Sequence, residues 1–408
     1  MPVTKIVRAD QLRPGMFISG FDLSWFEHPF VSSRLGLVND PVIIAQLKAL
    51  GVREVEIDLG RGLDVEDSDP PPPPRPECRD EPEAPLNVPP ASDQPRTLGF
   101  AKKLFTQALD CTKRVLGAVA EGKDLDLGDA RLLVGRLVTT VNANGSVLRL
   151  LSVLKAYDEY TYTHCVNVAA MGILFGKHLG LPDNQLEVLG MSGLMHDVGK
   201  CLLPPELVNK PGPLTGPEYE VMKRHTVLGW DYIKNQPGIP TPTAAGVLQH
   251  HERLDGTGYP GNIAGAEIPG ISRILSVLDV YDALTSDRVY RNRMSPHKAL
   301  RTLYEKRGKA FSETVLDGFI KCVGVYPPSS VVQLKNGCYA VVTGYDERQP
   351  LQPDLVIFRG PEGMPVKPRR VELLRLEGIR GKSGYEIARH VEPSEMPPPP
   401  EHVWLKPC

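Results

Sequence analysis

The feature that most constrains this chain is a proline-rich, acidic stretch that runs from about residue 64 to residue 95. It contains five successive prolines, followed by a mixture of charged residues and further prolines. A segment of this composition cannot bury enough apolar surface to offset the entropy that it would lose on ordering. We therefore predict a linker of polyproline character, so that residues 1–63 fold separately from the rest of the chain.

The part before the linker, residues 1–63, is predicted to be a small α/β domain, and we assign it a regulatory role as a hypothesis. A helix is expected at residues 41–50, because Asp40 can cap its start and Gly51 can cap its end. Apolar residues then alternate with charged ones near residues 55–57, which is typical of a short strand.

The part after the linker has a helical apolar pattern up to about residue 326. Residues 96–155 are expected to form packing helices, of which the first ends at Gly122 and two more lie near 129–143 and 146–156. These helices are interpreted as support for the larger helical domain that follows at residues 156–327, and not as a site themselves.

The last segment, residues 328–408, changes from the helical period to the alternation of strands. Two apolar runs at 331–335 and 338–343 flank Asn336-Gly337, which is a strong signal for a two-residue hairpin turn. The predicted fold class is therefore mainly α, with a small α/β domain in front of the helical domain and a small β-rich cap behind it.

Composition and charge exclude several classes of protein. With 408 residues, 41% of them hydrophobic, and a formal net charge of -2, the chain is long enough for two or three domains and is not a globally basic nucleic-acid binder. Its seven cysteines are scattered without a CxxC pair, which argues against a disulfide framework or a cysteine-type zinc site. No run of about 20 apolar residues suggests a membrane helix, and the start of the chain lacks a signal-peptide pattern. We therefore expect a cytoplasmic protein without membrane insertion.

Histidines and aspartates cluster on the helices of the domain at 156–327. Each histidine alone is most simply explained as a structural residue, but the set together indicates metal binding, because imidazole and carboxylate are typical ligands of first-row divalent metals. A shared carboxylate would also allow two ions to lie side by side. The candidate ligands are His164, His196, Asp197, His225, His250, His251 and Asp279.

At these residues the chain resembles the HD-GYP family of the HD phosphohydrolase superfamily. The His196-Asp197 doublet stands three residues before Lys200, and the Gly258-Tyr259-Pro260 tripeptide lies within the run HHERLDGTGYPG. The run LDVYDALTSDRVYR at 278–291 resembles the segment that follows in the family. The likeness covers about 156–327 and implies an HD-type helical bundle. Residues 1–60 resemble, more loosely, the small domain that precedes a subset of these proteins.

The resemblance implies two divalent ions, iron or manganese, with Asp197 bridging them. One ion would be held by Asp197 together with ligands from three helices, namely His164, His196 and Asp279. The other would be held by Asp197 together with His225, His250 and His251. Some members add a third ion through a glutamate four residues before the first histidine. That position is Tyr160 here, and Glu159 is one residue out of register, so we expect two ions.

The activity that the resemblance implies is hydrolysis of cyclic di-GMP to linear pGpG, and slowly to GMP, in bacterial signalling that controls biofilm formation and motility. Asp197, Lys200 and Asp282 are the expected catalytic residues, with Lys200 on a phosphate oxygen or the leaving group and Asp282 orienting water or a polar group of the ligand. Substrate contacts are expected from Lys200 and from Tyr259, Arg288 and Arg291. For Tyr259, lining of the cleft and packing of the turn remain equally open. The expected partners are the cyclic dinucleotide, a second copy of the chain or a signalling protein, but not a nucleic-acid polymer.

Two alternatives remain open from the sequence. Other HD phosphohydrolases act on mononucleotides and share the His196-Asp197 type of doublet, but they lack His250-His251 followed by the Gly-Tyr-Pro tripeptide. Some relatives of the family have lost ligands and act as binding or scaffold modules. The complete set of candidate ligands here makes that reading the weaker one.

Overall fold

The computed structural model describes most of the chain and divides it into two compact units, Met1–Pro85 and Leu86–Cys408. The predicted domain boundaries are not tested by this division and stay predictions. Most of the predicted linker, and the predicted helix at 41–50 apart from Ile44, lie outside the described residues. The described residues are 4–21, 36–38, 44, 54–64, 94–123, 127–151, 160–210, 212–286, 293–344, 352–373, 384–392, 395–396 and 399.

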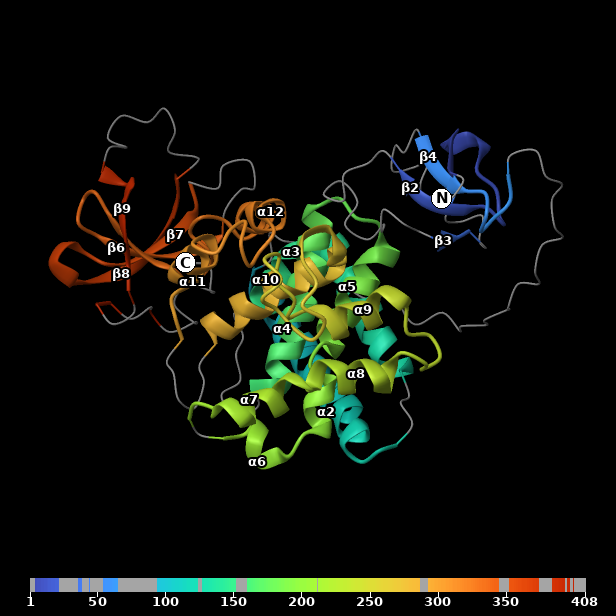
Figure 1. Cartoon of the computed structure of the whole chain (residues 1–408). Coiled ribbons are helices and arrows are strands. Elements are labelled where there is room, and N and C mark those ends of the chain that lie inside the picture. The colour runs from blue at the N-terminus through green and yellow to red at the C-terminus, as the bar shows by residue number, and fades with distance from the viewer. Residues whose placement is uncertain are drawn as a thin grey trace. The chain divides into compact units, whose positions relative to one another are not determined.

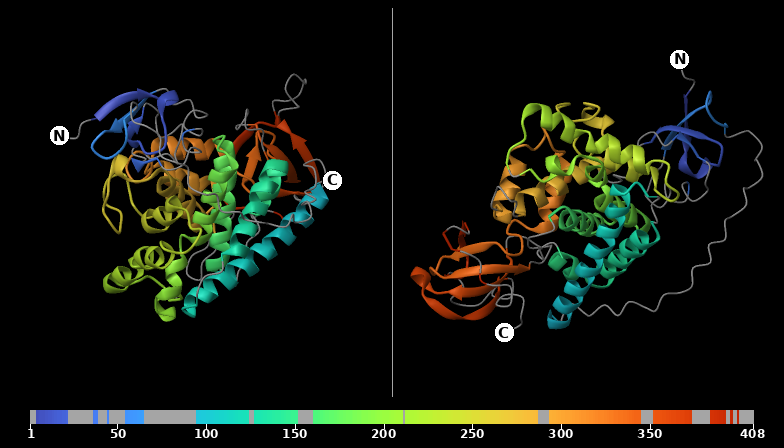
Figure 2. Two further views of the ribbon diagram at one scale, coloured as in Figure 1. Left: turned by 90° about the vertical axis from the view of Figure 1, so that its right-hand side faces the viewer. Right: turned by 90° about the horizontal axis from the view of Figure 1, so that it is seen from below.

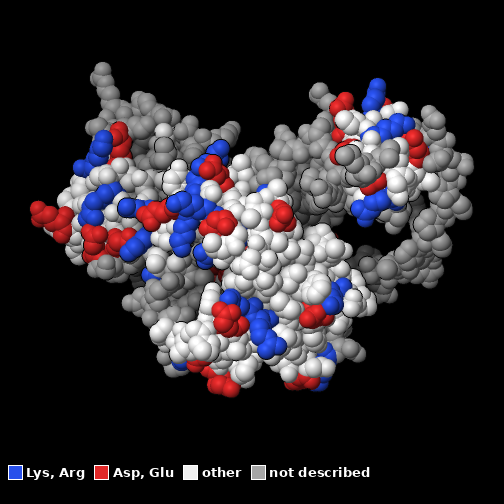
Figure 3. All heavy atoms as spheres, in the orientation of Figure 1, with Lys and Arg blue, Asp and Glu red and all other residues white. Residues whose placement is uncertain are grey.

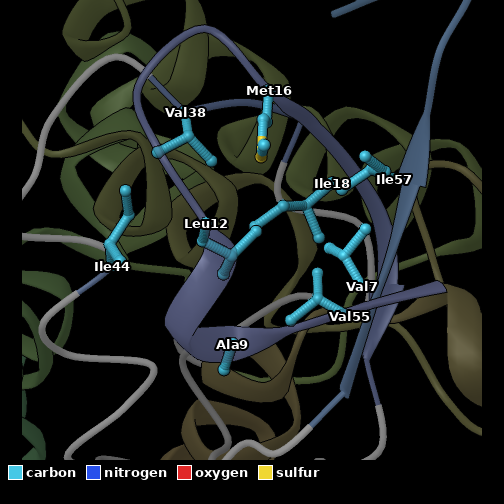
Figure 4. Packing of buried hydrophobic residues seen from close by; sticks show 9 residues of the cluster. All are labelled: Val7, Ala9, Leu12, Met16, Ile18, Val38, Ile44, Val55 and Ile57. Carbon is cyan, nitrogen blue, oxygen red and sulfur yellow. The ribbon is translucent and has the colours of Figure 1, made fainter. Parts of the chain in front are cut away.

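The first unit contains a four-stranded antiparallel sheet with the strand order β1-β4-β2-β3. Its strands are β1 (Thr4–Arg8), β2 (Phe17–Phe21), β3 (Gly36–Leu37) and β4 (Glu54–Asp58), with the short 3-10 helix η1 (Ala9–Gln11) after β1. Val7, Ile18 and Val55 project from three of these strands into one apolar cluster, as Figure 4 shows. The alternation expected near residues 55–57 is thus a strand, and its buried side chains complete the core.

The second unit begins with the two longest helices, α2 (Gln94–Ala120) and α3 (Gly128–Leu151), which lie side by side (Figures 1 and 2). The predicted end of the first helix at Gly122 is close to the observed one, and Gly122 has a φ of 66°. The two helices predicted near 129–143 and 146–156 are confirmed as far as Leu151, as two helical segments of α3 that meet at a break at Asn144. Asn144 adopts non-helical angles there (φ -158°, ψ 92°), so the change of direction occurs without a connecting loop.

Three helices form the centre of the unit: α4 (Tyr160–His178), α5 (Asp183–Met195) and α10 (Gly270–Thr285). Most side chains of α4 and α10 are buried on all sides, which is typical of helices that other elements surround. A Cβ atom on Gly193 would come within 2.6 Å of the Ala169 backbone, so glycine permits α5 to cross α4 closely. This crossing brings the end of α5 beside the first turns of α4.

The remaining helices surround this centre. Thr215 and Glu218 form the predicted capping box, with the Thr215 backbone N–H donating to Glu218 Oε2 at 2.7 Å. The helix predicted to follow this cap and to carry His225 is divided in two at Arg224. The elements are η2 (Val198–Leu202), α6 (Pro205–Val208), α7 (Gly216–Lys223), α8 (His225–Ile233), α9 (Thr241–Gln249), η3 (Gly265–Glu267), α11 (Pro296–Tyr304) and α12 (Glu313–Val323).

The unit ends in a five-stranded antiparallel sheet with the order β8-β7-β6-β5-β9. The predicted hairpin is confirmed, because β5 pairs with β6 across the Asn336-Gly337 turn. Figure 3 shows basic and acidic side chains interspersed over this sheet, in agreement with ion pairs such as Lys335 with Glu386. The elements are β5 (Val331–Leu334), β6 (Tyr339–Gly344), β7 (Asp354–Arg359), η4 (Pro361–Gly363), β8 (Pro365–Glu372) and β9 (Ile387–Val391).

In the parts of the chain that the structure describes, none of the helices combines the length and the apolar character needed to cross a bilayer. The cytoplasmic location expected from the sequence stays a prediction.

Candidate metal centre

The centre of the site is Asp197, which follows α5 and lies between two pairs of histidines. Its Oδ2 atom is 3.4 Å from Nε2 of His196 and 3.8 Å from Nε2 of His164. Its Oδ1 atom is 3.4 Å from Nε2 of His225 and 3.9 Å from Nε2 of His250. The Asp197 side chain is 2% exposed, and Oδ1 has no hydrogen-bond partner among the described residues. One carboxylate oxygen therefore faces each pair of imidazoles.

Backbone carbonyl groups fix the orientation of three of the imidazole rings. Nδ1 of His196 lies 2.8 Å from the carbonyl oxygen of residue 193, and Nδ1 of His225 lies 2.8 Å from that of residue 222. Nδ1 of His250 lies 2.9 Å from the carbonyl oxygen of residue 247. A carbonyl can only accept, so each Nδ1 carries the proton and donates it. The Nε2 atoms are therefore left with lone pairs that converge on Asp197.

The fourth ring, that of His164, is held by two carboxylates of α10. Its Nδ1 atom is 2.8 Å from Asp282 Oδ2, and its Nε2 atom is 3.0 Å from Asp279 Oδ1. Asn167 Nδ2 donates to the other Asp282 oxygen at 3.0 Å, and Ser286 Oγ donates to Oδ2 at 3.1 Å. Both oxygens of Asp282 are thus committed to protein groups.

This arrangement bears on the role expected of Asp282. Asp282 was expected to orient water or a polar group of the ligand, but it is buried and faces the far nitrogen of His164. A carboxylate in this position sets the tautomer of a metal-binding imidazole and raises its basicity. Asn167 and Ser286, which complete the carboxylate's hydrogen bonds, were not anticipated. Asn167 could have been identified from the sequence, because it lies three residues after His164 on the same face of the helix.

The electrostatics of the cluster favour neutral imidazole and ionised carboxylate. Burial lowers the pKa of His225 to about 4 and that of His251 to about 3, because it disfavours the imidazolium ion. Burial would raise the pKa of Asp197, but nearby Lys200 and His196 outweigh it and hold that pKa well below its usual range. These are the protonation states in which such groups bind metal without first losing a proton.

His164 is the exception. Burial alone would lower its pKa, but the hydrogen bonds to Asp279 and Asp282 outweigh it and raise the pKa to about 9.

Close backbone contacts bring α8 to the centre. A Cβ atom on Gly199 would lie 1.9 Å from the carbonyl oxygen of His225 and 2.5 Å from the Gly229 nitrogen. Only a glycine at this point of η2 lets the first turn of α8 approach Asp197 as it does. The glycine in the HDxGK run is therefore a packing requirement of the site.

The Gly-Tyr-Pro loop covers one side of the histidine cluster. The Tyr259 ring packs against that of His251, with centroids 4.7 Å apart and the two planes tilted by 30°. Glu252, which is 2% exposed, accepts a hydrogen bond from the Gly261 N–H at 2.6 Å and ties the end of the loop to the start. A Cβ atom on Gly258 would lie 2.4 Å from the Arg253 nitrogen. Tyr259 thus lies against a candidate ligand, and Glu252 is a supporting residue that the sequence analysis missed.

The other predicted site residues are only partly described. Lys200 Nζ lies 2.5 Å from Asp197 Oδ2, and its side chain is 25% exposed. Arg288 and Arg291 lie outside the described residues, as does Glu159. Tyr160 is the first residue of α4, but its side chain is not described. Their predicted roles stay predictions.

The donor set fits divalent metal ions. Among the described residues, ligand atoms within 4.8 Å of one another form three overlapping groups, and the buried Oδ1 of Asp197 has no hydrogen-bond partner there. Neutral imidazole nitrogens and carboxylate oxygens suit first-row metals such as iron, manganese or zinc. The groups are His225, His250 and His251; His164, His196 and Asp279; and His196, Asp197 and His250.

Comparison with known proteins agrees with this geometry. A sequence model described as an HD domain matches residues 149–315. A second, described as a domain of unknown function (DUF3391), matches residues 4–130, from the first sheet into the start of α3. A cyclic di-GMP phosphodiesterase of Pseudomonas aeruginosa is 34% identical over 392 residues, which are 94% of this chain and 92% of that relative.

Two further relatives match shorter parts of the chain. A cyclic di-GMP phosphodiesterase response regulator of Xanthomonas campestris is 32% identical over 194 residues, covering 47% of this chain and 51% of its own. A 3′3′-cGAMP-specific phosphodiesterase of Vibrio cholerae is 35% identical over 161 residues, covering 37% of this chain and 35% of its own.

The helical fold and the histidine–aspartate cluster define an HD-domain protein of the kind that binds divalent metal ions. With the Gly-Tyr-Pro loop against that cluster and a relative that matches nearly its whole length, the chain belongs to the HD-GYP family.

The carboxylate behind His164 provides a first prediction. Replacing Asp282 with asparagine places an amide nitrogen opposite either the Asn167 amide or the His164 N–H, so one hydrogen bond becomes a contact between two donors. We expect metal affinity to fall by about 10- to 100-fold, the range typical of residues that support a ligand. Metal titration of the apoprotein measures this. Asp183→Asn, on the exposed start of α5, is the matched control. Unchanged affinity in a folded Asp282→Asn protein would contradict the positioning role.

Proposed function

We propose that the protein is a metal-dependent phosphodiesterase that hydrolyses cyclic di-GMP to linear pGpG, and slowly to GMP, in bacterial second-messenger signalling. The observation that carries the proposal is Asp197, which presents one oxygen to each of two histidine pairs beside the Gly-Tyr-Pro loop. A carboxylate placed in this way suits two adjacent cations, the arrangement that phosphodiester hydrolysis uses. The curated relatives described above as cyclic di-GMP phosphodiesterases support the choice of substrate.

We assign each half of the cluster to one ion, iron or manganese, with Asp197 shared. The first would be held by Asp197 with His164, His196 and Asp279, and the second by Asp197 with His225, His250 and His251. When bound, the ions would act as Lewis acids that activate water and neutralise charge on the phosphodiester.

The chain's own residues would position the substrate and assist proton movement. Lys200 Nζ lies 2.5 Å from Asp197 Oδ2, and the side chain, which is 25% exposed, would place its ammonium group on a phosphate oxygen or on the departing 3′-oxygen. Asp282 acts indirectly, by holding the His164 ring through Nδ1. Tyr259 is proposed to line the site, and Arg288 and Arg291 are proposed to bind the phosphates of the substrate.

A second candidate function is hydrolysis of a different cyclic dinucleotide. The Vibrio cholerae relative that is named for 3′3′-cGAMP favours it, since that relative is 35% identical to this chain over 161 residues. The mononucleotide and scaffold alternatives are less well supported. A mononucleotide phosphohydrolase would not need the Gly-Tyr-Pro loop against His251. A binding or scaffold module would not need a complete set of metal ligands.

The proposal is tested by metal analysis and product chromatography on anaerobically purified protein. We expect about two ions per chain, because Tyr160 stands where a third ion would need a carboxylate and a phenol of ordinary pKa ~10 is a poor ligand. The main early product from cyclic di-GMP should be pGpG. Tyr160→Glu should increase metal occupancy and shift the product towards GMP.

Three results would count against these expectations. Absence of cyclic di-GMP hydrolysis in metal-loaded protein would overturn the function. About three ions per chain, or GMP as the dominant early product, would overturn the two-ion account. A Tyr160→Glu protein with unchanged metal content and product ratio would show that this position does not decide the number of ions. Tyr162→Glu, two residues along α4, is a matched control for added charge.

A further inference from the structure

The Gly-Tyr-Pro loop is flanked by a second aromatic ring, that of Tyr219 in α7. The ring centroids of Tyr219 and Tyr259 lie 6.4 Å apart, edge to face at 83°. Tyr259 itself packs against the ring of His251, one of the candidate ligands. Two successive ring contacts therefore lead outward from the metal centre, and Tyr219 is the outer member.

Tyr219 is fixed in place by its backbone and yet remains exposed. Its side chain is 47% exposed, while α7 begins with the capping box of Thr215 and Glu218. Lys210 Nζ also binds Glu218, at 2.6 Å and 2.8 Å from its two oxygens. An aromatic ring that is exposed on an anchored helix offers a face for stacking at small cost in conformational entropy.

A cation accompanies the two rings. Lys223 lies one turn after Tyr219 on α7, and its Nζ atom is 5.5 Å from the Tyr219 ring centroid and 5.8 Å from that of Tyr259. The same Nζ is held by Glu220 Oε1 at 2.8 Å, and the Lys223 side chain is 27% exposed. Lys223 therefore presents hydrogen-bond donors at the edge of the aromatic surface.

We infer that Tyr219 and Lys223 form a subsite for one guanine base of the dinucleotide, which stacks on Tyr219 while Lys223 donates to its O6 and N7 atoms. Guanine presents two acceptors on that edge, whereas adenine presents an amino donor at the same place, which an ammonium group cannot bind. A ribose separates each base from its phosphate. When a phosphate lies at the metal centre, its base must therefore lie at some distance from that centre. This inference rests on the proposed function, because it presupposes a cyclic dinucleotide as substrate.

The stacking role is tested by steady-state kinetics on two substrates with the metal-loaded, full-length protein. Tyr219→Ala should raise the KM for cyclic di-GMP by about tenfold or more, the effect typical of losing one stacked base. It should leave hydrolysis of methyl p-nitrophenyl phosphate, which has no base, unchanged. Tyr219→Trp should keep the low KM. Tyr304→Ala removes a comparably exposed tyrosine of α11 and should change neither activity.

The guanine contact is tested by competitive inhibition of the small substrate. GMP should inhibit the wild-type protein more tightly than AMP, and in Lys223→Met the ratio of the two inhibition constants should fall by about tenfold, towards one. Because the readout is a ratio for two ligands of the same protein, a merely structural effect of Lys223 would not move it.

The outcomes separate the inference from the proposed function. If the wild-type protein cleaves methyl p-nitrophenyl phosphate but not cyclic di-GMP, the proposed function fails and the inference fails with it. If cyclic di-GMP is cleaved and Tyr219→Ala keeps the wild-type KM, the stacking role is wrong. An unchanged ratio for GMP and AMP in Lys223→Met overturns the guanine contact. Matching metal content and circular dichroism spectra ensure that each variant is compared in the folded, loaded state.

Discussion

Replacing Asp197 with asparagine is expected to empty both halves of the metal centre and to lower hydrolysis of cyclic di-GMP by more than about a hundredfold, the upper range for residues that only support a ligand. One carboxylate oxygen faces His164 and His196, and the other faces His225 and His250. Asparagine replaces one oxygen by an N–H₂ donor, which cannot bind a cation, and leaves the other oxygen without negative charge, so both halves lose an anionic ligand. Metal content by mass spectrometry and product formation measure the two effects.

His196→Ala provides the comparison within the site, because it removes a ligand from one half only. We expect it to lose mainly one equivalent of metal, whereas Asp197→Asn loses both. Asp231→Asn, at a half-exposed carboxylate of α8, should match the wild-type protein in both measurements. If folded Asp197→Asn retains wild-type metal content and hydrolysis, Asp197 is not the shared ligand and the account of the centre fails.

The residue types and spacing of the motifs were enough to predict which side chains meet. All seven candidate ligands lie within the described residues, and the structure brings them to one place from five helices and their ends. The reason is that each motif stands at the end of a helix or inside a buried helix, where the side chain's direction follows from the helical period. His250 and His251, for example, directly follow α9, and Asp279 lies within α10.

The sequence did not predict which contact each of the two carboxylates of α10 makes. Asp279 and Asp282 lie one turn apart on α10, and both face His164. Which of them binds Nδ1 and which lies at Nε2 depends on the rotation of α10 against α4. That rotation is set by side chains packed along both helices, and no local pattern encodes it. The sequence therefore predicted that the two carboxylates lie in the site, but not which nitrogen of His164 each one faces.

The predicted helix boundaries were wrong where tertiary packing, and not local propensity, determines the end of a helix. No glycine or proline marks the division between α7 and α8 at Arg224, so a single helix was expected to carry His225. The close contact of Gly199 with the His225 carbonyl is a tertiary feature that only the folded chain reveals. At Asn144 the predicted boundary is confirmed, since two helical segments of α3 meet there at a break.

A second large effect is expected from a single methyl group at Gly199. Alanine there would bring Cβ to 1.9 Å from the His225 carbonyl oxygen and 2.5 Å from the Gly229 nitrogen, both of them backbone atoms of α8. Neither atom can rotate away, so η2 and α8 must separate. We expect the free energy of unfolding to fall by about 2–4 kcal/mol. Metal affinity should fall with it, because the 3.4 Å approach of His225 to Asp197 depends on this contact.

Gly135→Ala is the matched control for Gly199→Ala. Gly135 lies inside α3, and a Cβ atom there would have no neighbour within 4 Å among the described residues, so alanine should raise the free energy of unfolding by about 0.5–1 kcal/mol through its higher helix propensity. Urea unfolding followed by circular dichroism, with and without added metal, compares the two variants. The same substitution should thus act in opposite directions at the two positions. If Gly199→Ala were as stable as Gly135→Ala and kept wild-type metal affinity, the close approach of α8 to η2 would not be what positions His225.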